Sequence, residues 1–148
     1  MAGSNIVAVK RHIIATLPGL LGIVGDYSYV GKHHDGKREY LYLGSRATGT
    51  LAVSAMAAGG RIMRAEDPTF SLAIAVRTLG KQTTEAAEAR AVELGTLAEE
   101  WLAGNWKTAG IEGLTHLVIN RMELESGADD EGADALLTYT LQAHSQLR

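Results

Sequence analysis

The chain has 148 residues, a length that predicts a single domain over residues 1–148. It carries 14 Lys and Arg against 17 Asp and Glu, and this mildly acidic balance argues against a protein that grips a nucleic-acid backbone. The lack of cysteine excludes disulfides and thiolate zinc sites and fits a reducing cytoplasm. No stretch approaches the ~20 apolar residues of a membrane-spanning helix, so we expect no membrane partner.

The first expected element is a helix over residues 5–16, with Ser4 as its N-cap. Its apolar positions fall on one stripe, which comprises Ile6, Val9, Ile13 and Leu17. Pro18 and Gly19 follow, and both residue types stop helices, so the helix is predicted to end there.

Two stretches rich in tyrosine and leucine, residues 26–31 and 39–44, predict strands. Asp35-Gly36 between them is a turn signal, so the two strands are predicted to form an antiparallel hairpin. Residues 45–58 are small and nearly uncharged, and both a strand over 51–56 and a long loop remain open. Such an uncharged surface suits contact with another chain.

Residues 61–66 predict a short strand, and residues 69–79 alternate in the manner of a half-buried antiparallel strand. The apolar face of the second strand comprises Phe70, Leu72, Ile74 and Val76. A long helix then begins at Thr83 or Thr84, runs to about Leu102 and ends at Gly104. Its predicted apolar stripe comprises Ala87, Ala91, Leu94, Ala98, Trp101 and Leu102.

Two alternating stretches, 118–125 and 135–143, predict a final hairpin closed by a glycine-rich acidic turn. In the first stretch the pattern places Val118, Met122 and Leu124 on one face. The element order is therefore helix, four or five strands, helix and two strands. This order predicts an α+β fold with a mixed or mainly antiparallel sheet and both helices packed on one face.

The sequence contains only partial matches to the motifs that bind phosphate or metal or supply a catalytic nucleophile. Gly25 and Gly31-Lys32 resemble a phosphate loop, but five residues separate the glycines and His33 replaces the magnesium-binding hydroxyl. Adjacent His33, His34 and Asp35 predict a solvated turn rather than a metal site. The histidines elsewhere, His12, His116 and His144, have no spacing that completes one. No G-x-S-x-G turn occurs. We therefore predict no enzyme activity, no metal and no cofactor.

Five residues are candidates for a subunit interface: Met56, Arg61, Arg64, Glu66 and Trp106. Arg64 and Glu66 lie two apart on one strand face and can pair with each other or with charges of another subunit. Trp106 follows the long helix, where an aromatic residue suits either the core or an interface.

From Gly59 to Val76 the chain has a glycine pair, a strand with arginines and an acid, a turn and an alternating strand, and the long helix and two long strands follow. This order, which extends along most of the chain, resembles the tail terminator, or tail completion, proteins of long-tailed bacteriophages, especially those of actinobacterial hosts. The similarity lies in the order of elements, in Gly60, Arg64 and Glu66, and in the Glu88-Ala89-Arg90 step of the long helix. Residues 45–58 do not align with the family.

This resemblance implies a structural virion protein, assembled in the host cytoplasm and located at the head-proximal end of the tail. Family members form a six-membered ring on the tail tube, end tube growth and present a surface to the head–tail connector, or stopper, protein. The expected partners are thus further copies of the chain, the tail tube protein and the connector. Genomic DNA passes through the ring without being read, which fits the acidic balance of the chain.

Two alternatives remain open. A tail-tube protein or a head–tail joining protein has a similar small sheet. A small-molecule binding domain would instead use a pocket formed by Tyr27, Tyr29, Tyr40, Tyr42, His33 and His34.

Overall fold

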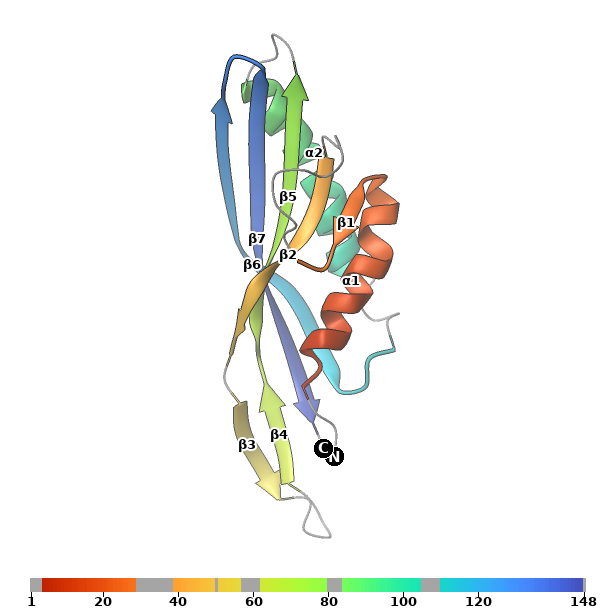
Figure 1. Cartoon of the computed structure of the whole chain (residues 1–148). Coiled ribbons are helices and arrows are strands. Elements are labelled where there is room, and N and C mark those ends of the chain that lie inside the picture. The colour runs from red at the N-terminus through yellow and green to blue at the C-terminus, as the bar shows by residue number, and fades with distance from the viewer. Residues whose placement is uncertain are drawn as a thin grey trace.

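The computed structural model of the protein describes residues 4–28, 39–49, 51–56, 62–79, 84–104 and 110–147, with the backbone alone for 52–56, 62–63 and 147. Within these residues it contains α1 (Ile6–Leu21), β1 (Val24–Asp26), β2 (Glu39–Thr48), β3 (Leu51–Met56), β4 (Ile62–Glu66), β5 (Thr69–Leu79), α2 (Thr84–Gly104), β6 (Leu114–Ala128) and β7 (Gly132–Leu147). The predicted α+β class with two helices and a mixed sheet is confirmed (Figure 1).

The described strands form one sheet in the order β1-β2-β5-β7-β4-β3, and β6 pairs with the other side of β7. The long strand β7 is the centre of this arrangement. It pairs with β5 through Thr69 and Gln142, and further along with β4 through Glu66 and Ser145. β3 and β4 thereby extend the sheet at the end of the molecule where both termini lie (Figure 1).

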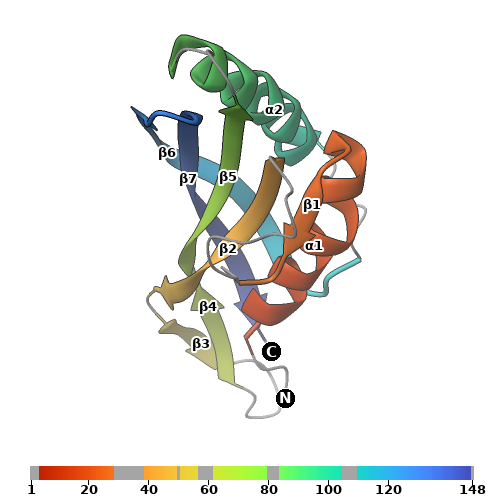
Figure 2. The same ribbon diagram turned by 45° about the horizontal axis from the view of Figure 1, so that its top comes forward.

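One hydrophobic core joins both helices to the sheet. α1 contributes Val9, Ile13, Leu17 and Leu21, and α2 contributes all six residues of its predicted stripe. In Figure 2, α2 lies over β5 and β7 while α1 lies beside β1 and β2. The helices meet where the His12 ring stacks on Trp101, with ring centroids 5.5 Å apart. Burial of each large apolar side chain contributes roughly 1.5–3 kcal/mol, so this core is the main source of stability.

Helix α1 does not stop at Pro18, which corrects the sequence prediction. Pro18 lies inside the helix, which continues to Leu21 and ends where Gly22 adopts a left-handed conformation with φ 72°. Burial of Leu17 and Leu21 on either side of the proline favours the continued helix. The backbone N–H groups of Gly22 and Ile23 then close the last turn on the carbonyls of Gly19 and Pro18.

The predicted hairpin between residues 26–31 and 39–44 is also wrong in its pairing. β1 covers Val24–Asp26 and pairs in parallel with β2, with Val24 opposite Tyr40 and Asp26 opposite Tyr42. The connection over residues 27–38 is long enough for a parallel crossover. The Asp35-Gly36 signal lies outside the described residues.

The alternation predicted for the first strand of the final hairpin is broken by a register shift. β6 is irregular between Ile119 and Arg121, so Val118 pairs with Gln142 while Met122 pairs with Tyr139. Directly paired residues in an antiparallel sheet share a face. Val118 and Met122 therefore lie on opposite faces of the sheet, because an inserted residue inverts the pattern beyond it.

Other predictions are confirmed. The final hairpin pairs along most of both strands. Of the two alternatives left open for residues 51–56, the structure shows the strand. The apolar face of β5 is buried, as is that of the last strand, with Leu137, Tyr139 and Leu141 each at most 1 % exposed.

Candidate functional site

The structure describes three of the five interface candidates. Arg61 and Trp106 lie outside the described residues. Met56 is the last residue of β3, where its backbone pairs with Ile62 of β4. Arg64 and Glu66 lie two apart on β4, and they pair along the strand with Leu147 and Ser145 of β7. The described candidates therefore gather on the β3–β4 extension of the sheet.

Glu66 has partners within its own chain. Its side chain is 8 % exposed, and its carboxylate accepts hydrogen bonds from the Ser4 hydroxyl at 3.0 Å and from the Asn5 backbone N–H at 2.8 Å. The N-cap of α1 is Asn5 rather than the predicted Ser4, but the Ser4 hydroxyl still accepts a hydrogen bond from the Ile6 N–H at 3.2 Å. A carboxylate at a helix N-terminus is stabilised by the unpaired N–H groups there. Glu66 thus fastens the start of α1 to the sheet.

Asn5 extends this network. Its amide nitrogen donates to the Glu112 carbonyl at 2.8 Å and to the Ser145 hydroxyl at 3.1 Å. Ser145 is buried in β7, so the network joins the chain start, β4, β7 and the turn before β6. The base of the β3–β4 extension is therefore held firmly to the body of the protein.

The sheet has an open strand on one side. β6 pairs with β7 alone among the described strands, although it is 15 residues long. Three of its apolar side chains are exposed: Val118 by 44 %, Met122 by 57 % and Leu124 by 36 %. An exposed strand edge presents unpaired N–H and C=O groups, which suits pairing with another chain.

The opposite side of the sheet is open as well. β1 covers β2 only at Tyr40–Tyr42, and no described strand pairs with that side of β2 beyond Tyr42. Residues 45–48 of β2 are exposed, and so is Leu51 at the start of β3. These residues belong to the small, weakly charged stretch that the sequence predicts as a contact surface.

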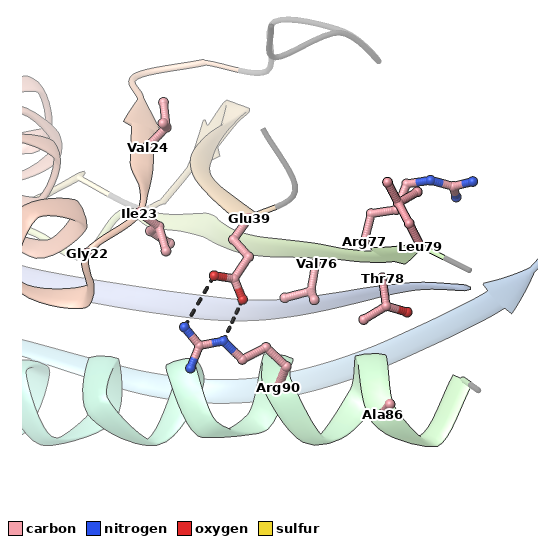
Figure 3. A pocket seen from close by; sticks show the side chains of 10 residues that line it. All are labelled: Gly22, Ile23, Val24, Glu39, Val76, Arg77, Thr78, Leu79, Ala86 and Arg90. Atoms are coloured by element: carbon pink, nitrogen blue, oxygen red, sulfur yellow. Dashed lines mark hydrogen bonds and ion pairs between the residues drawn. The ribbon is translucent and has the colours of Figure 1, made fainter. Parts of the chain in front are cut away.

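A cavity of about 780 Å³ lies between α2, β2, β5 and the turn after α1 (Figure 3). Its ionisable lining groups are already paired. The Arg90 guanidinium on α2 holds the Glu39 carboxylate with two hydrogen bonds, one of them 3.2 Å long, and this pairing raises the pKa of Arg90. Arg77 binds Asp134 at 2.8 Å and Asp129 at 3.0 Å, and Figure 3 shows its side chain pointing away from Arg90. The charged groups that line the pocket are thus held in ion pairs within the chain.

Of the tyrosines predicted to form a binding pocket, the structure describes Tyr27, Tyr40 and Tyr42, and none of these three lines that cavity. Tyr40 and Tyr42 stack on each other along β2, with ring centroids 5.9 Å apart. The Tyr27 ring lies 4.5 Å from the Lys10 ammonium, a cation–π contact that anchors α1. Tyr29, His33 and His34 lie outside the described residues.

His116 and His144, far apart in sequence, are cross-strand neighbours with ring centroids 6.1 Å apart. Residue spacing could not reveal this pair, since only the β6–β7 register brings the rings together. Within the described ranges, no group of three or more histidine and acidic side chains is placed to hold a metal ion. Neither described helix is long and apolar enough to cross a membrane.

No protein-family model matches this chain, and no curated protein matches it.

Proposed function

We propose that this chain is a structural virion protein that forms a ring, of six copies, at the head-proximal end of a bacteriophage tail tube. The ring ends tube growth and joins the tail to the head connector. The proposal rests on the resemblance of the element order, along most of the chain, to tail terminator proteins. One observation on the structure supports it most: among the described strands, none pairs with the outer side of β6 or with the side of β2 beyond Tyr42, so two different edges are open. Two different open edges on one chain suit head-to-tail contacts, which close into rings.

In this proposal the two helices form a single layer on one face of the sheet, and the other face is left for contacts within the particle. The His12–Trp101 stack and the shared core support the single layer. On the face away from the core, β7 presents polar side chains, among them Thr138, Thr140 and Gln142. Arg121 and Glu123 of β6 pair with Thr140 and Thr138 and share this face, so opposite charges lie beside the polar row rather than an excess of positive charge that would bind phosphates.

Mass photometry with negative-stain imaging over a concentration series tests the proposal. We expect closed rings of six with an open pore. Labelling the chain in the assembled particle then separates the related roles. A terminator contributes one ring at the joint between head and tail, whereas a tube protein contributes many stacked rings. Label absent from the tail, or present as isolated single copies, contradicts the proposal.

A further inference from the structure

We propose that neighbouring copies join edge to edge, with β6 of one copy adding as an antiparallel strand to the open side of β2, around Thr48, in the next copy. This inference rests on the proposed ring and names the surfaces that build it. The partner is a second copy of this chain.

The strand directions within one copy fit this contact. β2 is antiparallel to β5, β5 is antiparallel to β7, and β7 is antiparallel to β6. β2 and β6 therefore run in opposite directions. A rotation about an axis along the strands preserves every strand direction, so β6 of one copy meets β2 of the next in an antiparallel pair. Antiparallel pairing is the slightly more stable arrangement per residue.

The two edges also lie level with each other. Thr48 pairs with Thr69, Thr69 pairs with Gln142, and Gln142 pairs with Val118. These four residues form one row across the sheet, and directly paired residues point to the same face. The row begins at one open edge and ends at the other. Copies related by rotation without a shift along the strands would thus place Val118 beside Thr48.

The surfaces suit each other chemically. Residues 45–48 of β2 are exposed and small apart from Arg46, so a strand can approach without displacing large side chains. β6 carries one arginine, Arg121, and two glutamates, Glu123 and Glu125, which sum to a net charge of −1, opposite to that of Arg46. Exposed Val118 and Met122 on β6 would lose water contact on pairing.

Self-pairing of β6 about a two-fold axis is the competing arrangement. It would cover only one of the two edges and leave residues 45–48 open in every copy. The head-to-tail contact covers both edges, and a closed ring leaves neither exposed. The two arrangements make opposite predictions for single-cysteine variants.

Because the chain has no cysteine, a single Cys substitution gives a protein with only one thiol. Thr48→Cys and Val118→Cys are made separately, mixed in equal amounts and oxidised mildly. We expect a disulfide-linked dimer from the mixture and none from either variant alone. Paired strands lie ~4.7–4.9 Å apart, within the usual Cα separation of a disulfide. His116→Cys and Arg121→Cys, whose partners His144 and Thr140 flank Gln142 on β7, test a register shifted by one pair in either direction.

The double variant Thr48→Cys/Val118→Cys should give a ladder of covalent oligomers that ends at the ring size. Leu20→Cys mixed with Thr48→Cys is the matched control, since Leu20 is 61 % exposed and lies on α1 away from both edges. That mixture should stay unlinked. In parallel, Val118→Lys/Met122→Lys should abolish rings while Leu20→Lys leaves them intact, with all variants folded by circular dichroism.

Each result decides a specific point. Disulfide dimers from Val118→Cys alone overturn the head-to-tail contact in favour of β6 self-pairing. Visible rings without cross-links in any of the three registers overturn the inference and leave the ring proposal standing. Cross-linked chains that grow past six without closing support the contact and contradict the ring. The absence of both rings and cross-links contradicts both.

Discussion

The carboxylate of Glu66 on β4 lies 2.8 Å from the backbone nitrogen of Asn5, so a strand residue supplies the acceptor for the first turn of α1. The same carboxylate accepts from the Ser4 hydroxyl, and Asn5 reaches on to Ser145. The residue that the sequence marks as an interface candidate therefore has a role within the folded monomer. Stability measurements can separate this internal role from a role in assembly.

We expect Glu66→Ala to lower the free energy of unfolding by about 1–3 kcal/mol, because it removes a buried carboxylate and leaves the Ser4 hydroxyl and the Asn5 N–H, in a partly buried site, without their acceptor. Urea unfolding followed by circular dichroism measures this loss. The control is Glu112→Ala, which removes an exposed carboxylate but keeps the backbone carbonyl that Asn5 binds, and it should change stability by less than about 0.5 kcal/mol. Equal stability of Glu66→Ala and the unaltered protein would contradict the internal role.

At Gly95, α2 packs directly against side chains of β7. A Cβ atom there would lie 2.4 Å from both Leu137 Cδ2 and the Tyr139 hydroxyl, and both side chains are fully buried. Gly95→Ala should therefore destabilise the protein by about 1–3 kcal/mol despite the better helix propensity of alanine.

Gly19→Ala in α1 is the matched control for Gly95→Ala. No atom lies within 4 Å of a Cβ at Gly19, so propensity alone should act and stabilise the protein by up to about 1 kcal/mol. Thermal unfolding of both variants checks the pair. A higher melting temperature for Gly95→Ala would show that α2 does not pack this closely.

We expect the protein to lose stability at alkaline pH because the phenol of Tyr139 is buried. Burial, together with the charge of Glu99, raises the pKa of Tyr139 to about 12 from the ordinary value of 10.0. The neutral phenol is thus favoured in the folded state. Its contribution to stability is fully present below pH 10 and is lost as the pH rises from 10 to 12. The full effect is about 3 kcal/mol, since one pKa unit corresponds to ~1.4 kcal/mol.

Denaturant unfolding of the unaltered protein and of Tyr139→Phe between pH 8 and 11.5 tests this expectation. The two proteins should lose stability at different rates above pH 10, with the shallower slope for Tyr139→Phe. Parallel slopes over that range would mean that the phenol of Tyr139 ionises in the folded state as easily as in water.

The Arg90–Glu39 pair across the cavity should contribute modestly. The side chains of Arg90 and Glu39 are 37 % and 28 % exposed. Water therefore screens the two charges, even though two hydrogen bonds join them. A double-mutant cycle with Arg90→Ala and Glu39→Ala should give a coupling of about 0.5–1 kcal/mol that falls at high salt. A coupling above about 2 kcal/mol would show that the pair is far better shielded than its exposure indicates.

Local periodicity explains why much of the fold was predictable. In β5 and β7 the inward side chains occupy every second position, and in α2 the stripe from Ala87 to Leu102 follows the helical repeat. Each pattern depends only on neighbouring residues. The predictions failed where a contact with residues distant in sequence outweighed a local signal. Pro18 predicts the end of α1, but the helix continues to Leu21 because Leu17 and Leu21 are buried in the core.

The candidate site was less predictable for the same reason. Glu66 was found from its place beside Arg64, but its partners Ser4 and Asn5 are some 60 residues away. The His116–His144 pair depends on strand register, and the shift after Ile119 turns Met122 to the face opposite Val118. No local pattern contains a register, because register is set by the pairing partner.

The amino-acid sequence by itself determined the class of this protein: two amphipathic helices, alternating strands and a final hairpin. It also indicated that residues 45–58 form a surface for another chain. Only the tertiary structure decided that β1 runs parallel to β2 and that, within the part of the chain that it describes, no strand covers the outer edges of β6 and of β2 beyond Tyr42. Side-chain alternation shows which face of a strand is buried, whereas hydrogen bonding at its edges depends on which strands the fold places beside it.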